Sequence, residues 1–132
     1  CLLSNGAPSS YGGVQFYIYN NSLDFYAHNT SGGYLVSGVT GPASSISANT
    51  WHHVAVVRNG TAFTCYVDGV GGTPATGSGA IDASTGSAAI GIYIPNSTLP
   101  FAGYIDEYRI SKFARYTSNF TPSTEAFPDK GQ

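Results

Sequence analysis

The sequence predicts an all-β protein, an antiparallel sandwich of two sheets. Short runs with apolar residues at every second position recur along the chain, and Gly, Pro and Asn separate them. No segment repeats its apolar residues with the 3.6-residue period of a helix. The 132 residues are enough for one domain with a real core.

The stretch from Trp51 to Gly69 is the centre of this prediction. Two alternating runs rich in Val, Phe and Tyr flank Asn59-Gly60, a dipeptide that tolerates the positive φ angles of a type I′ turn. A two-residue turn there pairs Val56 with Phe63 and points Cys65 inward as a small buried hydrophobe. Because neither face of this hairpin is strongly polar, we expect it to lie centrally in its sheet with cover on both sides.

A second hairpin is predicted from Val14 to His28, with its turn at Asn20-Asn21. One face is apolar, and the other combines aromatic and polar groups. In the register that the turn dictates, Tyr17 lies across from Asp24. The candidate ligand-binding residues are those of this second face: Gln15, Tyr17, Tyr19, Asp24, Tyr26 and His28.

Further strands are expected at the start of the chain and at residues 34–37, 87–94 and 101–111, with an irregular crossing over 70–85. The domain is taken to span residues 1–128, and 129–132 are a tail or the start of a linker. After residue 112 we expect a short helical turn and then an extended strap, held by Phe113, Tyr116, Phe120 and Phe127.

Charge is scarce, and this excludes some partners. Charged residues make up 9% of the chain, against roughly 25% in an ordinary soluble domain, and the formal net charge is −2. No basic cluster is present to neutralise phosphates, so nucleic acid is not expected as a partner. No run approaches the ~20 apolar residues of a membrane span, so we expect no membrane insertion.

Three motifs occur in order: Trp51–Arg58 (WHHVAVVR), Tyr66–Gly69 (YVDG) and Gly103–Ile110 (GYIDEYRI). Together they resemble the laminin G-type, concanavalin A-like jelly-roll domains over roughly residues 2–128. The tail from Ile110 to Pro122 is also similar to the variant found in phage tail and other virion structural proteins. Such domains usually begin with two or three strands upstream of the Leu2-Leu3-Ser4 segment. The resemblance therefore implies that the first strands are missing here, and that a longer polypeptide or another chain completes the sheet.

Most motif residues have structural explanations. Trp51 is expected to be a packing anchor between layers, because a large ring that begins a central strand normally fills such a space. His52 and His53 point to opposite faces and so cannot jointly hold one metal ion.

Catalysis is not expected. Retaining glycoside hydrolases of the same superfamily need two carboxylates about 5 to 5.5 Å apart. The only glutamates here are Glu107 and Glu125, and no Glu-x-Asp-x-Glu pattern occurs. The resemblance implies a structural role for Asp106, Glu107 and Arg109, which we expect to form a partly buried ion pair.

Two functions remain open. The first is a non-catalytic glycan- or cell-surface-binding module of a larger phage, virion or extracellular protein. The alternative is a structural decoration or assembly domain of a virion or surface fibre, with virion or fibre subunits as partners and an oligomeric state. Laminin G-type domains often carry calcium, for which oxygen donors are available at Asp24, Asp68 and Asp82. No dense acidic loop is present, so calcium stays a possibility without an assigned site.

Overall fold

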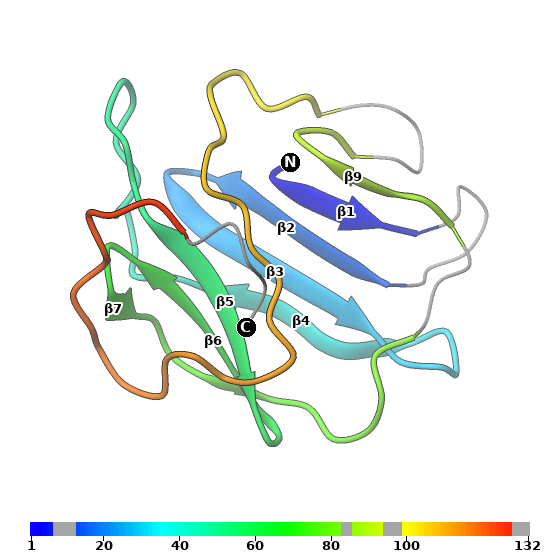
Figure 1. Cartoon of the computed structure of the whole chain (residues 1–132). Helices are drawn as coiled ribbons and strands as arrows, with labels where there is room; N and C mark the ends of the chain where they lie inside the picture. Colours follow the sequence, from blue (N-terminus) through cyan, green and yellow to red (C-terminus); the bar gives the residue numbers. More distant parts are fainter. Residues whose placement is uncertain (7–12, 83–85, 94–98, 128–132) are drawn as a thin grey trace.

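The computed structural model describes residues 1–6, 13–82, 86–93 and 99–127 (Figure 1). In these residues it contains β-strands in two antiparallel sheets, which confirms the predicted all-β sandwich. Across the same ranges, no helix has the length and apolar character needed to cross a membrane. The strands are β1 (Leu3–Asn5), β2 (Val14–Tyr19), β3 (Ser22–His28), β4 (Tyr34–Thr40), β5 (Val54–Asn59), β6 (Ala62–Val67), β7 (Val70–Gly71), β8 (Ala75–Thr76) and β9 (Ala88–Ile90).

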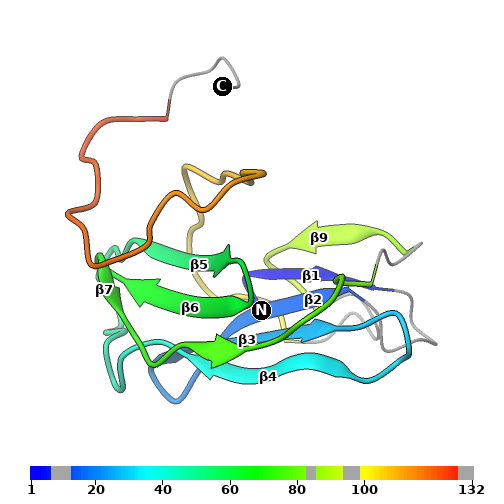
Figure 2. The same ribbon diagram turned by 90° about the horizontal axis from the view of Figure 1, so that it is seen from below.

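The two sheets form two layers (Figure 2). The first has the order β4-β3-β2-β1-β9, and the second has the order β5-β6-β7, with β8 also paired to β6. Strand β6 packs over β3 and β4. At this contact the rings of Phe25 and Phe63 stack with their centroids 6.1 Å apart. The core between the layers consists of Leu2, Phe16, Leu23, Phe25, Ala27, Val36, Val39, Phe63, Cys65 and Val67.

Cys65 lies in this core, as predicted. It is fully buried, and its thiol donates to the Val39 carbonyl oxygen at 3.2 Å. Burial raises the pKa of the Cys65 thiol to about 12. Cys1 and Cys65 are both free, so no disulfide joins them.

The β2–β3 hairpin has the predicted register, with Tyr17 opposite Asp24. Asn20 and Asn21 have φ angles of 46° and 59°. Positive φ at both central residues is typical of a type I′ turn, and asparagine tolerates this conformation. The predicted turn is therefore confirmed.

The predicted register of the β5–β6 hairpin is wrong by two residues. Val56 pairs with Cys65 and Asn59 with Ala62, so the turn residues are Gly60-Thr61. Gly60 has a φ of +61° while Thr61 does not have a positive φ, which is typical of the type II′ turn with Gly in its first central position. A slip of two residues preserves the faces of both strands. The core-facing side chains are still those predicted: Val54, Val56, Phe63, Cys65 and Val67.

The prediction that this hairpin lies centrally in its sheet is correct for β6 but wrong for β5. β6 has partners on both sides, whereas β5 forms the edge of its sheet in the part of the chain that is described. Trp51, just before β5, is 69% exposed. At this exposure its ring does not fill a space between layers, so the predicted packing anchor is wrong.

Residues 101–111 do not form the expected last strand. Glu107 has a φ of +53°, which interrupts an extended conformation, and Tyr104 is 85% exposed. The expected strand at 87–94 is shorter and consists of β9, while Ile94 lies outside the described residues, as do positions 129–132. The crossing over 70–85 contains the short strands β7 and β8. The expected helical turn does not occur within residues 112–127.

The C-terminal strap packs on the outer face of the second sheet. The rings of Tyr116 and Phe120 stack 3.5 Å apart, and both contact Tyr66 and His53. The strap is thus held by Tyr116 and Phe120, as predicted. Phe113 is exposed, so its predicted part in holding the strap is wrong. Phe127 instead lies under a guanidinium group, that of Arg109.

Candidate functional site

An aromatic ladder crosses the outer face of the five-stranded sheet. It lies on strands β2, β3 and β4, which run side by side in Figure 1. We define the ladder as Tyr17, Tyr26, Tyr34 and His28. The rings of Tyr17 and Tyr26 are stacked at 5.7 Å, and Tyr34 lies 5.7 Å from Tyr26 and 4.6 Å from His28. The rings of Tyr17 and Tyr26 are close to parallel, at 11°, whereas the other two pairs are tilted by 56° and 36°.

A β-bulge adds Tyr34 to the ladder. Ala27 pairs with Val36 and His28 with Tyr34, so Leu35 is skipped in the register. This extra residue turns Tyr34 to the outer face although Val36, two positions later, is in the core. Simple alternation would place both on one face. Sequence reasoning missed Tyr34 for this reason.

Gly38 forms a second irregularity beneath the ladder. The register also shifts between Phe25 and Ala27, and Gly38 has a φ of +63°. A Cβ atom at Gly38 would lie 3.5 Å from the Tyr26 hydroxyl and 3.8 Å from Asp24 Oδ1. These are ordinary contact distances, so the positive φ, and not lack of space, favours glycine at this position.

Asp24 lies beside the ladder, where burial disfavours the charged form of its carboxyl group. Its Oδ1 atom is buried and has no hydrogen-bond partner among the described residues. Burial raises the pKa of Asp24, although hydrogen bonds from the Phe25 backbone and the Tyr26 side chain act in the opposite direction. The pKa of Tyr17 is also raised, mainly by burial and further by its hydrogen bond with Tyr26 and the charge of Asp24. The site thus contains a buried carboxylate oxygen to which no described residue donates.

The structure places the six predicted residues on one face, but not in one cluster. Tyr17, Asp24, Tyr26 and His28 belong to or adjoin the ladder. Gln15 lies toward β1, where its side-chain amide donates to the Tyr93 hydroxyl at 3.4 Å. Tyr19 is exposed next to the turn.

His28 is buried within the ladder. Burial lowers its pKa, and the charge of Asp82 acts in the opposite direction. The imidazole is therefore neutral at pH 7, and it adds no positive charge to the site.

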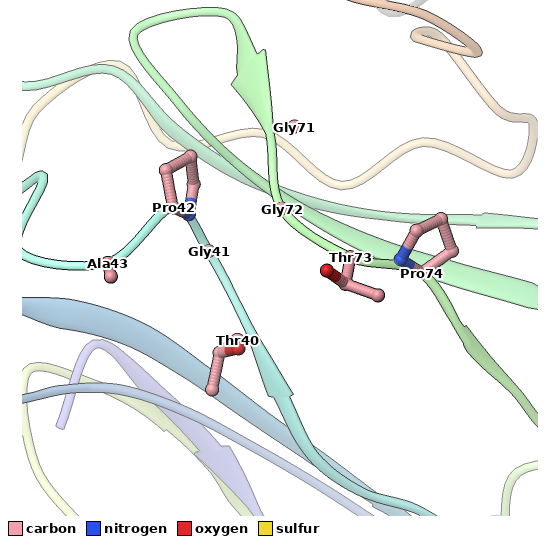
Figure 3. A pocket seen from close by; sticks show the side chains of 8 residues that line it. All are labelled: Thr40, Gly41, Pro42, Ala43, Gly71, Gly72, Thr73 and Pro74. Atoms are coloured by element: carbon pink, nitrogen blue, oxygen red, sulfur yellow. The ribbon is translucent and has the colours of Figure 1, made fainter.

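A shallow pocket of about 510 Å³ lies where the end of β4 meets the loop after β7 (Figure 3). Backbone atoms, two hydroxyl groups and two proline rings form its walls. It has neither an aromatic nor a charged side chain, so it offers a ligand few specific contacts. Its residues are Thr40, Gly41, Pro42, Ala43, Gly71, Gly72, Thr73 and Pro74.

A hydrogen-bonded chain of Ser47, His52 and Asp68 lies at the start of β5. Ser47 Oγ is 2.9 Å from His52 Nε2, and His52 Nδ1 is 2.7 Å from Asp68 Oδ2. This order also occurs in hydrolase triads. However, the Ser47 N–H donates to the same Nε2 at 3.0 Å, and half of the Asp68 side chain is in water. We interpret these hydrogen bonds as structural, because they fasten the loop before β5 to the turn after β6. We call Ser47, His52 and Asp68 the lock.

The two histidines point in opposite directions, as predicted. His52 belongs to this lock, which sequence reasoning missed because Ser47 carries no recognisable motif. His53 instead contacts the rings of Tyr116 and Phe120 on the outer face of the second sheet. Its pKa is lowered, first by burial and also by Arg109, while Asp68 acts in the opposite direction.

The predicted ion pair of Asp106, Glu107 and Arg109 is wrong. The Arg109 guanidinium lies 3.7 Å above the Phe127 ring, and Asp106 accepts from the Glu107 N–H. Glu107 accepts a hydrogen bond from the backbone N–H of Phe127. Since residues 103–110 form no strand, the alternation that would align these charges is absent.

A metal centre is not evident in the described part of the chain. It contains no group of three or more His, Cys, Asp or Glu side chains that could hold an ion. Asp24, Asp68 and Asp82, the candidate oxygen donors for calcium, do not form such a group. These residues therefore do not provide the six to eight oxygens that calcium prefers.

Comparison with protein families places the chain in a known family. The family model Laminin_G_3, described as the concanavalin A-like lectin/glucanases superfamily, matches residues 2–118. Comparisons with curated proteins and with solved structures found no match. The matched region includes both sheets and the ladder. The chain thus belongs to the Laminin_G_3 family of the concanavalin A-like lectin/glucanases superfamily.

Proposed function

We propose that the chain is a non-catalytic glycan-binding module of a larger virion or extracellular protein. The ligand contacts the outer face of the five-stranded sheet. The observation that carries this proposal is the position of Asp24 beside the aromatic ladder, with a buried oxygen that lacks a hydrogen-bond partner. Sites of this kind combine aromatic surface with a few placed polar groups.

The chemistry of the face suits a polyhydroxyl ligand. An ionised carboxylate can only accept hydrogen bonds, so the buried oxygen of Asp24 would gain from a donor such as a sugar hydroxyl once the side chains that cover it move aside. The phenol groups of Tyr17 and Tyr26 can both donate and accept, as sugar hydroxyls can. Because His28 is neutral and Asp24 is an acid, the face favours neutral sugars over sialylated or sulfated ones.

The same face supports binding without hydrolysis. Retaining hydrolysis needs a second carboxylate about 5 to 5.5 Å from the first. Within the described ranges, Asp24 is the acidic residue that adjoins Tyr17 and Tyr26, and both glutamates of the chain lie elsewhere, at positions 107 and 125. Asp24 would therefore position a sugar without attacking it.

A glycan array tests this proposal. We expect Tyr26→Ala to reduce retention on neutral glycans at least tenfold, because it removes the central ring and the hydroxyl next to Asp24. The matched control is Tyr104→Ala, which removes an exposed tyrosine that is not part of the ladder. Circular dichroism checks that both variants fold. Equal retention of wild type and a folded Tyr26→Ala variant would reject the glycan site.

A second candidate is a structural domain of a virion or surface fibre. Exposed apolar side chains along residues 99–113 support it, since protein interfaces are enriched in such residues. The tail resembling virion proteins is consistent with it as well. Sedimentation velocity distinguishes the two: an assembly domain self-associates or joins a fibre partner, whereas a simple binding module sediments as a monomer.

A further inference from the structure

The C-terminal strap, residues 112–127, contains neither strand nor helix and meets the second sheet over a short stretch. The Phe120 N–H donates to the Gly69 carbonyl oxygen at 3.0 Å, and the Gly71 N–H donates to Asn119 Oδ1 at 2.9 Å. Figure 2 shows the strap, in orange and red, touching this sheet beside β7 and then running away from both layers. A modest change in free energy at this contact is therefore enough to detach the strap.

The ring of His53 lies under this contact. Its centroid is 5.9 Å from that of Tyr116 and 5.4 Å from that of Phe120, with both pairs edge to face. Tyr66 of β6 completes the aromatic cluster, and the phenols of both tyrosines carry no charge in acid. The Nδ1 atom of His53 is buried and has no hydrogen-bond partner in the described part of the chain. A neutral imidazole fits this site, whereas a protonated one would place an unpaired, charged N–H donor in it.

The charged groups near His53 do not give its ring a partner. Asp68 lies in the turn after β6, but its Oδ1 accepts the His53 backbone N–H and its Oδ2 contacts His52 Nδ1. Arg109, from the segment before the strap, adds a positive charge. Burial lowers the pKa of His53, Arg109 lowers it further, and Asp68 acts in the opposite direction. The closed strap therefore opposes protonation of the ring beneath it.

We propose that the strap is a pH-sensitive cover, which leaves the outer face of the second sheet in mild acid when the His53 imidazole takes up a proton. Opening exposes the ring to water, where a charge is solvated. The open state therefore binds a proton that the closed state excludes, and the closed state is fully stable only above the ordinary histidine pKa of about 6.5. Its stability falls as pH decreases from there toward the lower pKa of the closed state.

The response is confined to the strap. The core residues between the sheets have no side chain that gains a charge in mild acid. On the first sheet, acid removes the charge that burial disfavours at Asp24. His28 is buried as well, but it lies on the outer face of that sheet against Tyr34. This device is thus separate from the proposed glycan site, because the strap covers the other sheet.

Amide hydrogen exchange measured by NMR tests the proposal. The Phe120 amide reports on the strap, and the Gly41 amide, which donates to the Leu23 carbonyl oxygen at 3.1 Å, reports on the sandwich. Each rate is compared with the intrinsic rate at the same pH, which removes the chemical pH dependence of exchange. Between pH 7 and pH 5 we expect protection of the Phe120 amide to fall at least about fivefold. The upper limit is about 25-fold for a group that titrates at 6.5 when open. Protection of the Gly41 amide should stay constant.

Histidine variants locate the trigger. His53→Phe should make the protection of the Phe120 amide independent of pH, because phenylalanine keeps a ring in the cluster and binds no proton. His28→Phe is the matched control, since it replaces a buried histidine of the first sheet, and it should keep the wild-type response. In wild type, the ring carbon shifts of His53 should titrate over the pH range in which protection is lost.

The contradicting outcomes are equally specific. The proposal fails if protection of the Phe120 amide in wild type does not change with pH, or if His53→Phe responds as wild type does. It also fails if the His53 ring stays neutral while the strap opens. Parallel loss of protection at Gly41 would mean that acid unfolds the whole sandwich, and loss of the response in folded His28→Phe would move the trigger to the first sheet.

Discussion

The main chains of Gly69 and Phe120 approach so closely that no side chain fits between them. The Phe120 N–H donates to the Gly69 carbonyl oxygen at 3.0 Å, and a Cβ atom at Gly69 would lie 1.8 Å from the Phe120 oxygen. Gly69 also has a φ of +82°, which residues with side chains rarely adopt. This contact attaches the C-terminal strap to the turn after β6.

Gly69→Ala should release the strap, because the clash and the φ angle both oppose the native contact. We expect trypsin to cleave after Arg115 at least tenfold faster than in wild type. Gly60→Ala is the matched control. Gly60 also has a positive φ, of +61°, but no atom lies within 4 Å of the Cβ that the substitution adds. It should cost only about 1 kcal/mol and leave cleavage at Arg115 unchanged. Equal cleavage of both variants would contradict this view of the strap.

The thiol of Cys65 should be inert in the native protein. Its pKa is raised to about 12 by burial, so almost none of the reactive thiolate is present at pH 8. In a Cys1→Ser variant, which leaves Cys65 as the only thiol, we expect Ellman's reagent to react only after denaturant is added. Rapid reaction in native buffer would mean that the core around Val39 opens readily.

The sequence was sufficient to predict the hairpins and their faces. Alternating side chains decide which face is buried, and this pattern survives a register slip of two residues, as in β5–β6. The turn of that hairpin was misplaced because Asn59-Gly60 and Gly60-Thr61 are both acceptable turn dipeptides. Only the pairing of the strands distinguishes them.

The errors concern residues whose environment depends on distant partners. Trp51 and residues 101–111 were expected in strands from their sequence patterns, but a strand also needs a paired neighbour along its length. In the described residues, the backbone hydrogen bond from Phe101 to Gly91 does not continue into a ladder, and neither Trp51 nor residues 101–111 lie in a strand. Tyr34 was missed because a bulge reverses the alternation at Leu35. Of the site, the pair of Tyr17 and Asp24 could be predicted, because the hairpin turn fixes it.

Asp24→Asn should stabilise the protein at neutral pH. The raised pKa of Asp24 means that folding disfavours its charged form, and this cost is present at pH 7 and disappears as pH falls through the folded-state pKa. We expect a higher free energy of unfolding than that of wild type at pH 7, and little difference near pH 3, in urea unfolding. A lower free energy of unfolding for Asp24→Asn than for wild type at pH 7 would contradict this prediction. The same substitution should weaken glycan retention.

His53 should make the protein less stable in mild acid. Its folded-state pKa is lowered by burial, so both states are neutral above about pH 7. Below the unfolded-state pKa of about 6.5 the unfolded chain binds a proton that the folded chain excludes, and stability falls. His53→Phe keeps an aromatic ring against Tyr116 and Phe120 and should reduce the loss of unfolding free energy between pH 7 and pH 5. An unchanged pH dependence would assign the effect to other groups, such as His28.

The lock of Ser47, His52 and Asp68 should contribute to stability as a unit. His52→Ala removes the ring that joins the other two residues, and Asp68→Ala removes the acceptor of both His52 Nδ1 and the His53 N–H. We expect each to cost about 1 to 2 kcal/mol in urea unfolding, with a coupling of about 1 kcal/mol between them in a double-mutant cycle. Asp68→Asn is the control, since it tolerates the φ of +50° at this position and keeps one acceptor oxygen. If the losses of His52→Ala and Asp68→Ala were additive, the short His52–Asp68 contact would contribute nothing to stability, as for many exposed ion pairs. The loop before β5 would then be held by its backbone alone.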